Sequence, residues 1–148
     1  MSTAYIPKDL RQRILKEFHN RCAYCHVVIA ITGARLVIDH IIPEAKGGQT
    51  IWGNLCSACH SCNEFKGSLL MGLDPLTQEQ EPLFHPFEHH WNEHFCWSKD
   101  GGQIIGLTSN GRATVAALNM NHLEIVEARR RWASVGWHPP DGDNQCLG

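Results

Sequence analysis

The chain lacks any long hydrophobic run, and charged residues are scarce. Of its 148 residues, 43% are apolar and 19% are charged, and every uninterrupted apolar stretch is only a few residues long. A membrane-spanning helix needs about 20 predominantly apolar residues, so the sequence excludes such helices. The composition also differs from that of disordered chains, which are poor in apolar residues and rich in charge. We therefore expect a soluble globular protein with one domain, or with a small domain and an extension.

The N-terminal sequence has no basic start followed by an apolar stretch, the pattern of a secretory signal peptide. We therefore expect a cytoplasmic protein, because the cytoplasm keeps thiols reduced. The seven cysteines are then expected to bind a metal rather than to form disulfides.

An excess of positive charge is also missing. Lys and Arg number 13 against 15 acidic residues, a formal net charge of −2, which argues against a generally basic nucleic-acid binder. The charge is uneven, because residues 1–70 hold eight basic and five acidic side chains, whereas the rest of the chain carries a net −5. Any contact with a polyanion is therefore expected in the N-terminal half.

Four of the cysteines form two Cys-x2-Cys pairs. Cys22 and Cys25 make the first pair, Cys59 and Cys62 make the second, and 33 residues separate the pairs. A gap of two residues lets both sulfurs of a pair reach one ion at about 2.3 Å. Four thiolates fill a tetrahedral zinc site and leave no position for water or substrate, so the sequence predicts a structural zinc.

Two alternatives stay open for this cluster. Cys56 also precedes Cys59 by three positions and His60 is a conceivable ligand, so the second pair could have another register. An iron–sulfur cluster would use the same thiolates. With the first assignment, three cysteines are left as small buried hydrophobes or inert tail residues, namely Cys56, Cys96 and Cys146.

Short elements are expected in the first half. Pro7 and the helical spacing of its apolar residues predict a helix over 7–19. Residues 35–40 are rich in β-branched side chains and predict a strand, with 50–52 as its partner in a hairpin. A helix is expected from near Asn63 to Gly67, and residues 67–92 are expected to be irregular.

The second half predicts another hairpin and two helices. The hairpin pairs 95–97 with 104–107 across a turn at 99–102, and the helices cover 112–118 and a segment capped by Asn121. Residues 138–148 are expected to be a frayed tail. Four histidines could form a second metal site, although their aromatic neighbours favour packing, namely His85, His89, His90 and His94.

Polar residues follow a fixed order between and beside the cysteine pairs. Asp39-His40-Ile41-Ile42-Pro43 is followed by Gly47-Gly48, then by Asn54-Leu55, and finally by Asn63-x2-Lys66-Gly67. Over about residues 20 to 67 the sequence thereby resembles the HNH endonuclease family in its zinc-bound ββα-metal form. More loosely, several segments between Leu83 and Thr114 resemble the C-terminal part of some small bacterial and cyanobacterial HNH proteins, which assigns no chemistry.

The resemblance implies an α+β fold. Residues 1–70 would form a ββα-metal, treble-clef-like nuclease core with two zinc knuckles. Residues 71–148 would form a C-terminal hairpin-and-helices extension packed on that core. The implied activity is metal-dependent endonuclease cleavage of DNA, with double-stranded DNA as the expected substrate.

The same resemblance implies a role for each motif residue. His40 matches the general base, Asn54 matches the residue that orients the loop, and Asp39 and Asn63 match ligands of a catalytic Mg²⁺ or Mn²⁺. A neutral imidazole can take the proton of an attacking water, and a hard cation with oxygen ligands offsets charge on the phosphate. From its own chemistry, Lys66 could contact a DNA phosphate as a point charge or could be a solvated surface lysine.

Two features depart from a simple site. Strand alternation places Asp39 and His40 on opposite faces unless the strand bends, and Gly67 stands where some relatives have a further metal ligand.

Two other functions stay open. The chain could be a zinc-stabilised DNA-binding module without catalysis, or a protein-interaction scaffold, although retention of His40 and Asn63 favours the enzyme.

Overall fold

A computed structural model describes residues 5–147. These residues form two compact units. The first unit runs to Leu70 and also includes His85–Glu88, and the second contains Met71–Phe84 and the chain from His89 onward. Residues 1–4 and Gly148 lie outside the described residues. The first four belong to the segment in which we predicted no signal peptide, and Gly148 is the last residue of the predicted tail. No helix within residues 5–147 is long and apolar enough to cross a membrane.

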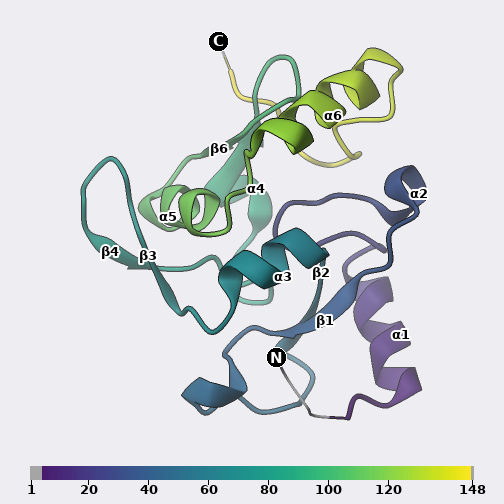
Figure 1. Cartoon of the computed structure of the whole chain (residues 1–148), viewed down its shortest axis with the longest axis vertical. Helices are drawn as coiled ribbons and strands as arrows, with labels where there is room; N and C mark the ends of the chain where they lie inside the picture. The colour runs from purple at the N-terminus through teal and green to yellow at the C-terminus, as the bar shows by residue number, and fades with distance from the viewer. Residues whose placement is uncertain (1–4, 148) are drawn as a thin grey trace. The chain divides into compact units, whose positions relative to one another are not determined.

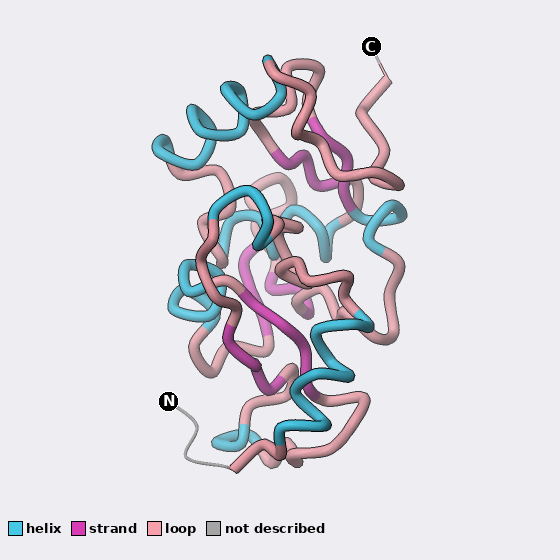
Figure 2. Tube along the Cα trace, turned by 90° about the vertical axis from the view of Figure 1, so that its right-hand side faces the viewer, coloured by secondary structure: helices cyan, strands magenta, loops and turns pink. Residues whose placement is uncertain are grey.

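Short helices and three two-stranded antiparallel sheets make the fold α+β, as expected (Figures 1 and 2). The first unit contains α1 (Lys8–Glu17), α2 (Ile29–Thr32), β1 (Val37–His40), the 3-10 helix η1 (Glu44–Lys46), β2 (Leu55–Ala58) and α3 (His60–Lys66). The second contains β3 (Met71–Leu73), β4 (Gln80–Pro82), α4 (Trp91–His94), β5 (Phe95–Trp97), β6 (Ile104–Gly106), α5 (Ser109–Ala117) and α6 (Leu123–Ser134).

The strand partner of β1 differs from the prediction. β1 pairs with β2, so that His40 lies opposite Leu55, and residues 50–52 form no strand. Trp52 instead packs edge-on against Phe87, and the Arg13 guanidinium lies 4.7 Å from the centre of its ring. Side-chain packing therefore holds this segment outside the hairpin, and the two strands are joined by a long loop, 41–54.

α3 begins three residues earlier than predicted. Its N-cap is Cys59, whose sulfur accepts a hydrogen bond from the Cys62 backbone N–H at 3.4 Å. A thiol thus takes the capping position usually held by Ser, Thr, Asp or Asn. α3 packs against β1, and α1 packs against β2 through its apolar face, where Ile14 is fully buried.

The segment 67–92 was predicted to be irregular, but it contains β3, β4 and α4, which all lie in the second unit. Gly72 in β3 approaches α5 so closely that a Cβ atom there would lie 3.0 Å from the Ala113 carbonyl oxygen. Arg112 on α5 donates two hydrogen bonds to the Asp74 carboxylate after β3, at 3.0 and 2.9 Å. These contacts join residues distant in sequence, so local patterns did not reveal the hairpin.

The second predicted hairpin is present as β5 and β6, and α5 and α6 follow it. The cap of α6 is His122, however, and not Asn121. The Asn121 side chain instead bonds the backbone N–H and C=O of Ile104, at 2.8 and 2.9 Å. Tertiary hydrogen bonds to β6 thus outweigh the local capping pattern.

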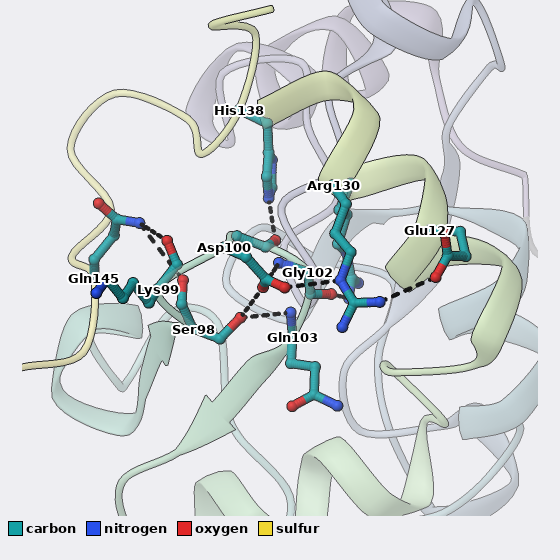
Figure 3. Close-up of polar contacts among 11 residues, drawn as sticks. Ser98, Lys99, Asp100, Gly102, Gln103, Glu127, Arg130, His138 and Gln145 are labelled. Atoms are coloured by element: carbon teal, nitrogen blue, oxygen red, sulfur yellow. Dashed lines mark hydrogen bonds and ion pairs between the residues drawn. The ribbon is translucent and has the colours of Figure 1, made fainter. Parts of the chain in front are cut away.

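The turn between β5 and β6 is fastened by its own side chains and by α6 (Figure 3). The Asp100 carboxylate accepts hydrogen bonds from the Ser98 hydroxyl, the Gly102 backbone N–H and the Arg130 guanidinium, each at 2.8 to 2.9 Å. Arg130 also pairs with Glu127 at 3.0 Å. The turn is therefore ordered by polar contacts rather than by an apolar core.

The C-terminal segment is not the frayed tail that we predicted. Within the described residues, the Trp97 backbone N–H donates to the Asn144 carbonyl at 3.0 Å, and the Cys146 N–H donates to the Trp97 carbonyl at 2.8 Å. Cys96 and Cys146, predicted to be free thiols, form a disulfide. The prediction was wrong because backbone pairing returns the tail to β5 and brings together two cysteines that lie 50 positions apart.

The disulfide predicts a thiol count and a stability difference. Five cysteines are free, so five thiols are expected to react in denatured, chelator-treated protein, and all seven after reduction. Cys146→Ser is expected to lower the free energy of unfolding of the second unit by about 2 to 4 kcal/mol, because an open loop restores entropy to the unfolded chain. Denaturant titration of both proteins measures the difference. Seven reactive thiols before reduction would contradict the disulfide.

Candidate metal centre and active site

The sulfurs of the two Cys-x2-Cys pairs gather at one point in the first unit. All four ligand atoms, from Cys22, Cys25, Cys59 and Cys62, lie within 4.8 Å of one another, and the Cys25 and Cys59 sulfurs are 3.7 Å apart. Tetrahedral zinc with Zn–S bonds of about 2.3 Å requires sulfurs about 3.8 Å apart. The cluster is therefore compatible with a structural zinc ion.

The chemistry of the thiols also fits a cation. Burial raises the pKa of the Cys22 thiol, and the neighbouring thiols raise that of Cys62. Hydrogen bonds from the other three thiols lower the pKa of Cys59. Because two of the four thiols, Cys22 and Cys62, resist ionisation on their own, a metal that binds four thiolates must displace their protons.

The other candidate ligands lie outside this cluster. Within residues 5–147 no other group of three or more His, Cys, Asp or Glu side chains could hold a metal ion. Cys56 is fully buried in β2, opposite Asp39 in the hairpin. His60 is exposed at the start of α3. The geometry therefore favours the register with Cys59 and Cys62.

Asp39 lies on β1 with a buried carboxylate between two donors. The Tyr24 hydroxyl donates to Oδ2 at 2.9 Å, and Lys66 Nζ forms an ion pair with the same oxygen at 3.0 Å. Burial raises the pKa of Asp39, while Lys66 foremost, then Tyr24 and His40, act in the opposite direction. Both donors contact Oδ2, which leaves Oδ1 as the oxygen able to coordinate a cation.

Lys66 does not lie where a contact with a DNA phosphate requires it. Its side chain is only 2% exposed, and Nζ also donates to the His40 carbonyl oxygen at 2.9 Å. The ammonium group thus compensates a buried carboxylate and links α3 to β1. The prediction treated Lys66 as a surface charge, because the sequence does not show which face of α3 is buried.

His40 ends β1, and its imidazole meets the loop 41–54. Nε2 lies 2.8 Å from the Thr50 hydroxyl oxygen, and the residue is 5% exposed. If Nε2 carries the proton and donates to Thr50, Nδ1 has the free lone pair that a base requires. Thr50 is therefore the residue that holds the Nε2 side of the His40 ring.

Asn54 fixes the same loop from inside. Its Oδ1 accepts from the Ile42 N–H at 2.8 Å, and its Nδ2 donates to the carbonyls of Ile42 and Gln49 at 3.1 and 2.8 Å. Gly48 must be glycine here, because a Cβ atom would lie 1.7 Å from the Ile42 carbonyl oxygen. The conformation of the loop around His40 is thus fixed by the Asn54 side-chain amide and by the close packing of the Gly48 and Ile42 backbones.

Asn63 lies one helical turn before Lys66 on α3, and it is half-buried. Residues three positions apart share a helix face, and Lys66 shows that this face turns toward β1. Helix spacing therefore places Asn63 near the face of α3 from which Lys66 contacts β1, while the His40 imidazole contacts the loop at Thr50.

Two residues of this site, Tyr24 and Thr50, were not singled out from the sequence. Tyr24 stands inside the first Cys-x2-Cys pair, and Thr50 follows the glycine pair of the loop. For Tyr24, its position between two expected zinc ligands was the one feature of the sequence that could have indicated a role in the site. Nothing in the local pattern connects Thr50 with His40.

Comparison with known proteins supports the reading of this region. Residues 22–69 match the family model described as HNH endonuclease. No curated protein and no solved structure gives a significant match to the chain. The matched range contains both cysteine pairs, β1, β2 and α3. Residues 22–69 are therefore identified as an HNH endonuclease domain, which covers about a third of the chain.

Proposed function

We propose that the protein is a metal-dependent endonuclease that hydrolyses phosphodiester bonds in double-stranded DNA. The observation that carries the proposal is that Asp39 and His40 stand side by side at the end of β1, where Lys66 of α3 contacts both of them. In this proposal β1, β2 and α3 form the ββα-metal core. The HNH match supports the reaction class.

The donor set fits a hard divalent cation. A carboxylate oxygen of Asp39 and the amide oxygen of Asn63 would hold Mg²⁺ or Mn²⁺, which prefer oxygen ligands. When bound, the cation would offset negative charge on the phosphate and on the departing oxygen. Lys66 already neutralises the Asp39 carboxylate, so the site has little net negative charge and is expected to bind the cation weakly without substrate.

His40 acts as the general base in this mechanism. In the tautomer protonated at Nε2, Thr50 would accept a hydrogen bond from Nε2–H, and Nδ1 would remove the proton from the attacking water. Asn54 and Gly48 keep the loop 41–54 in place, so that the ring does not turn away. The four cysteines hold a structural zinc that carries no chemistry.

We also propose a domain division and a cellular location for the protein. We assign residues 1–70 to the nuclease core and residues 71–148 to an extension without a catalytic role. The protein is proposed to act in the cytoplasm, where the five other cysteines would stay reduced, although the Cys96–Cys146 disulfide is a bond that is rare there.

Plasmid relaxation tests the function and the division between two metals. Moderate EDTA is expected to abolish cleavage by removing the weakly held cation, and added Mg²⁺ or Mn²⁺ should restore it while zinc content stays constant. Metal analysis on the same samples provides the control. Activity that follows zinc content alone would contradict a separate catalytic cation. DNA binding without cleavage in every metal would instead support a non-catalytic DNA-binding module.

A further inference from the structure

One buried hydroxyl group next to Asp39 has no role in the mechanism above. Tyr24 is fully buried, and its hydroxyl donates to Asp39 Oδ2 at 2.9 Å. A buried tyrosine hydroxyl could bond to any nearby carbonyl group. Here it bonds to the single carboxylate that we assign to the cation.

Two donors from different elements meet at one oxygen of that carboxylate. Tyr24 comes from the first cysteine pair and Lys66 from α3, and their distances to Oδ2 are 2.9 and 3.0 Å. With one donor, the carboxylate could rotate about the remaining contact. With two donors on the same oxygen the rotation is restricted, and Oδ1 is presented in a fixed direction.

The Tyr24 ring is itself held firmly in place. Its neighbours Cys22 and Cys25 belong to the sulfur cluster, and the Ala23 N–H donates to the Ser57 carbonyl of β2 at 2.8 Å. The Cys25 N–H also lies 3.5 Å from the Cys22 sulfur. The loop that bears Tyr24 is thus fixed both by the cysteine cluster and by the sheet.

We propose that Tyr24 is a positioning residue that orients the Asp39 carboxylate so that Oδ1 coordinates the catalytic cation. This inference rests on the proposed role of Asp39 as a cation ligand. It makes the first cysteine pair more than a zinc-binding element, because the loop that holds two cysteines also aligns a ligand of the second metal. Groups that hydrogen-bond to metal ligands commonly change metal affinity 10- to 100-fold when they are removed.

Mn²⁺ binding to zinc-loaded protein without DNA tests the inference. Tyr24→Phe removes one oxygen atom and is expected to weaken Mn²⁺ binding about tenfold or more, with zinc content unchanged. Electron paramagnetic resonance of free Mn²⁺ gives the affinity without relying on cleavage. The titration uses the zinc-loaded fraction, so that a variant with lower stability still reports on its site.

Two further variants make the result specific. Thr114→Val also removes a fully buried hydroxyl group that donates a hydrogen bond, here to the Asn110 carbonyl at 2.7 Å in the second unit, and it is expected to leave Mn²⁺ affinity unchanged. Asp39→Asn is expected to weaken binding at least as much as Tyr24→Phe. Unchanged affinity in Tyr24→Phe or in Asp39→Asn would overturn the inference, as would an equal loss in Thr114→Val. If the expected affinities are found but the wild type cleaves no DNA, the positioning role stands and the proposed nuclease function fails.

Discussion

His40→Ala is expected to slow DNA cleavage by about 10²- to 10⁴-fold, the usual contribution of a positioned general base. The imidazole is nearly buried and its Nε2 contacts Thr50, so the variant is also expected to lose some stability, and the rates are compared on folded, zinc-loaded protein. Zinc content and DNA affinity are expected to stay nearly unchanged, because a neutral imidazole adds little attraction to phosphate. Initial cleavage rates in saturating Mg²⁺ measure the effect.

His60→Ala provides a matched control for this experiment. His60 lies in the same unit but is exposed at the start of α3, and its removal is expected to leave the rate unchanged. A His40→Ala protein that cleaves as fast as the wild type would refute the role of His40. A variant that loses DNA binding instead of turnover would favour the non-catalytic module.

Cys25→Ser is expected to release zinc and to unfold the first unit. Its sulfur is one of four that meet within 4.8 Å, and the affinity of a structural zinc site is part of the folding free energy. Apparent zinc-binding free energies of about 10–16 kcal/mol in small zinc domains are comparable with the whole stability of a typical protein, about 5–15 kcal/mol. Metal analysis and hydrogen exchange over residues 5–70 measure the two effects.

Cys56→Ala distinguishes this result from the simple loss of a buried thiol. Cys56 is fully buried but lies outside the cluster, so the variant should retain its zinc and lose only packing energy. If Cys56→Ala loses zinc and Cys62→Ser retains it, the second ligand pair would be Cys56 and Cys59 instead of Cys59 and Cys62. Well-folded wild-type protein without zinc would contradict the structural-metal assignment.

The sequence predicted the parts of the fold that depend on local spacing. The two Cys-x2-Cys pairs predicted a four-sulfur cluster, because a two-residue gap suits one ion. Helical spacing after Pro7 predicted α1, and a hairpin with a polar turn predicted β5 and β6. The order of Asp39, His40, Asn54 and Asn63 between the pairs indicated the HNH family, which the match over residues 22–69 bears out.

Contacts between distant residues decided the rest. Lys66 is buried against Asp39, 27 positions away in the sequence, and Cys146 returns to Cys96 across 50 positions. Neither the buried face of a short helix nor the return of a tail changes the local pattern, because both depend on which other surface packs there. The sequence by itself therefore determined the chemical types available for a site. Only the tertiary structure decided which of them are buried, paired and oriented, since burial and charge compensation are properties of the packed chain.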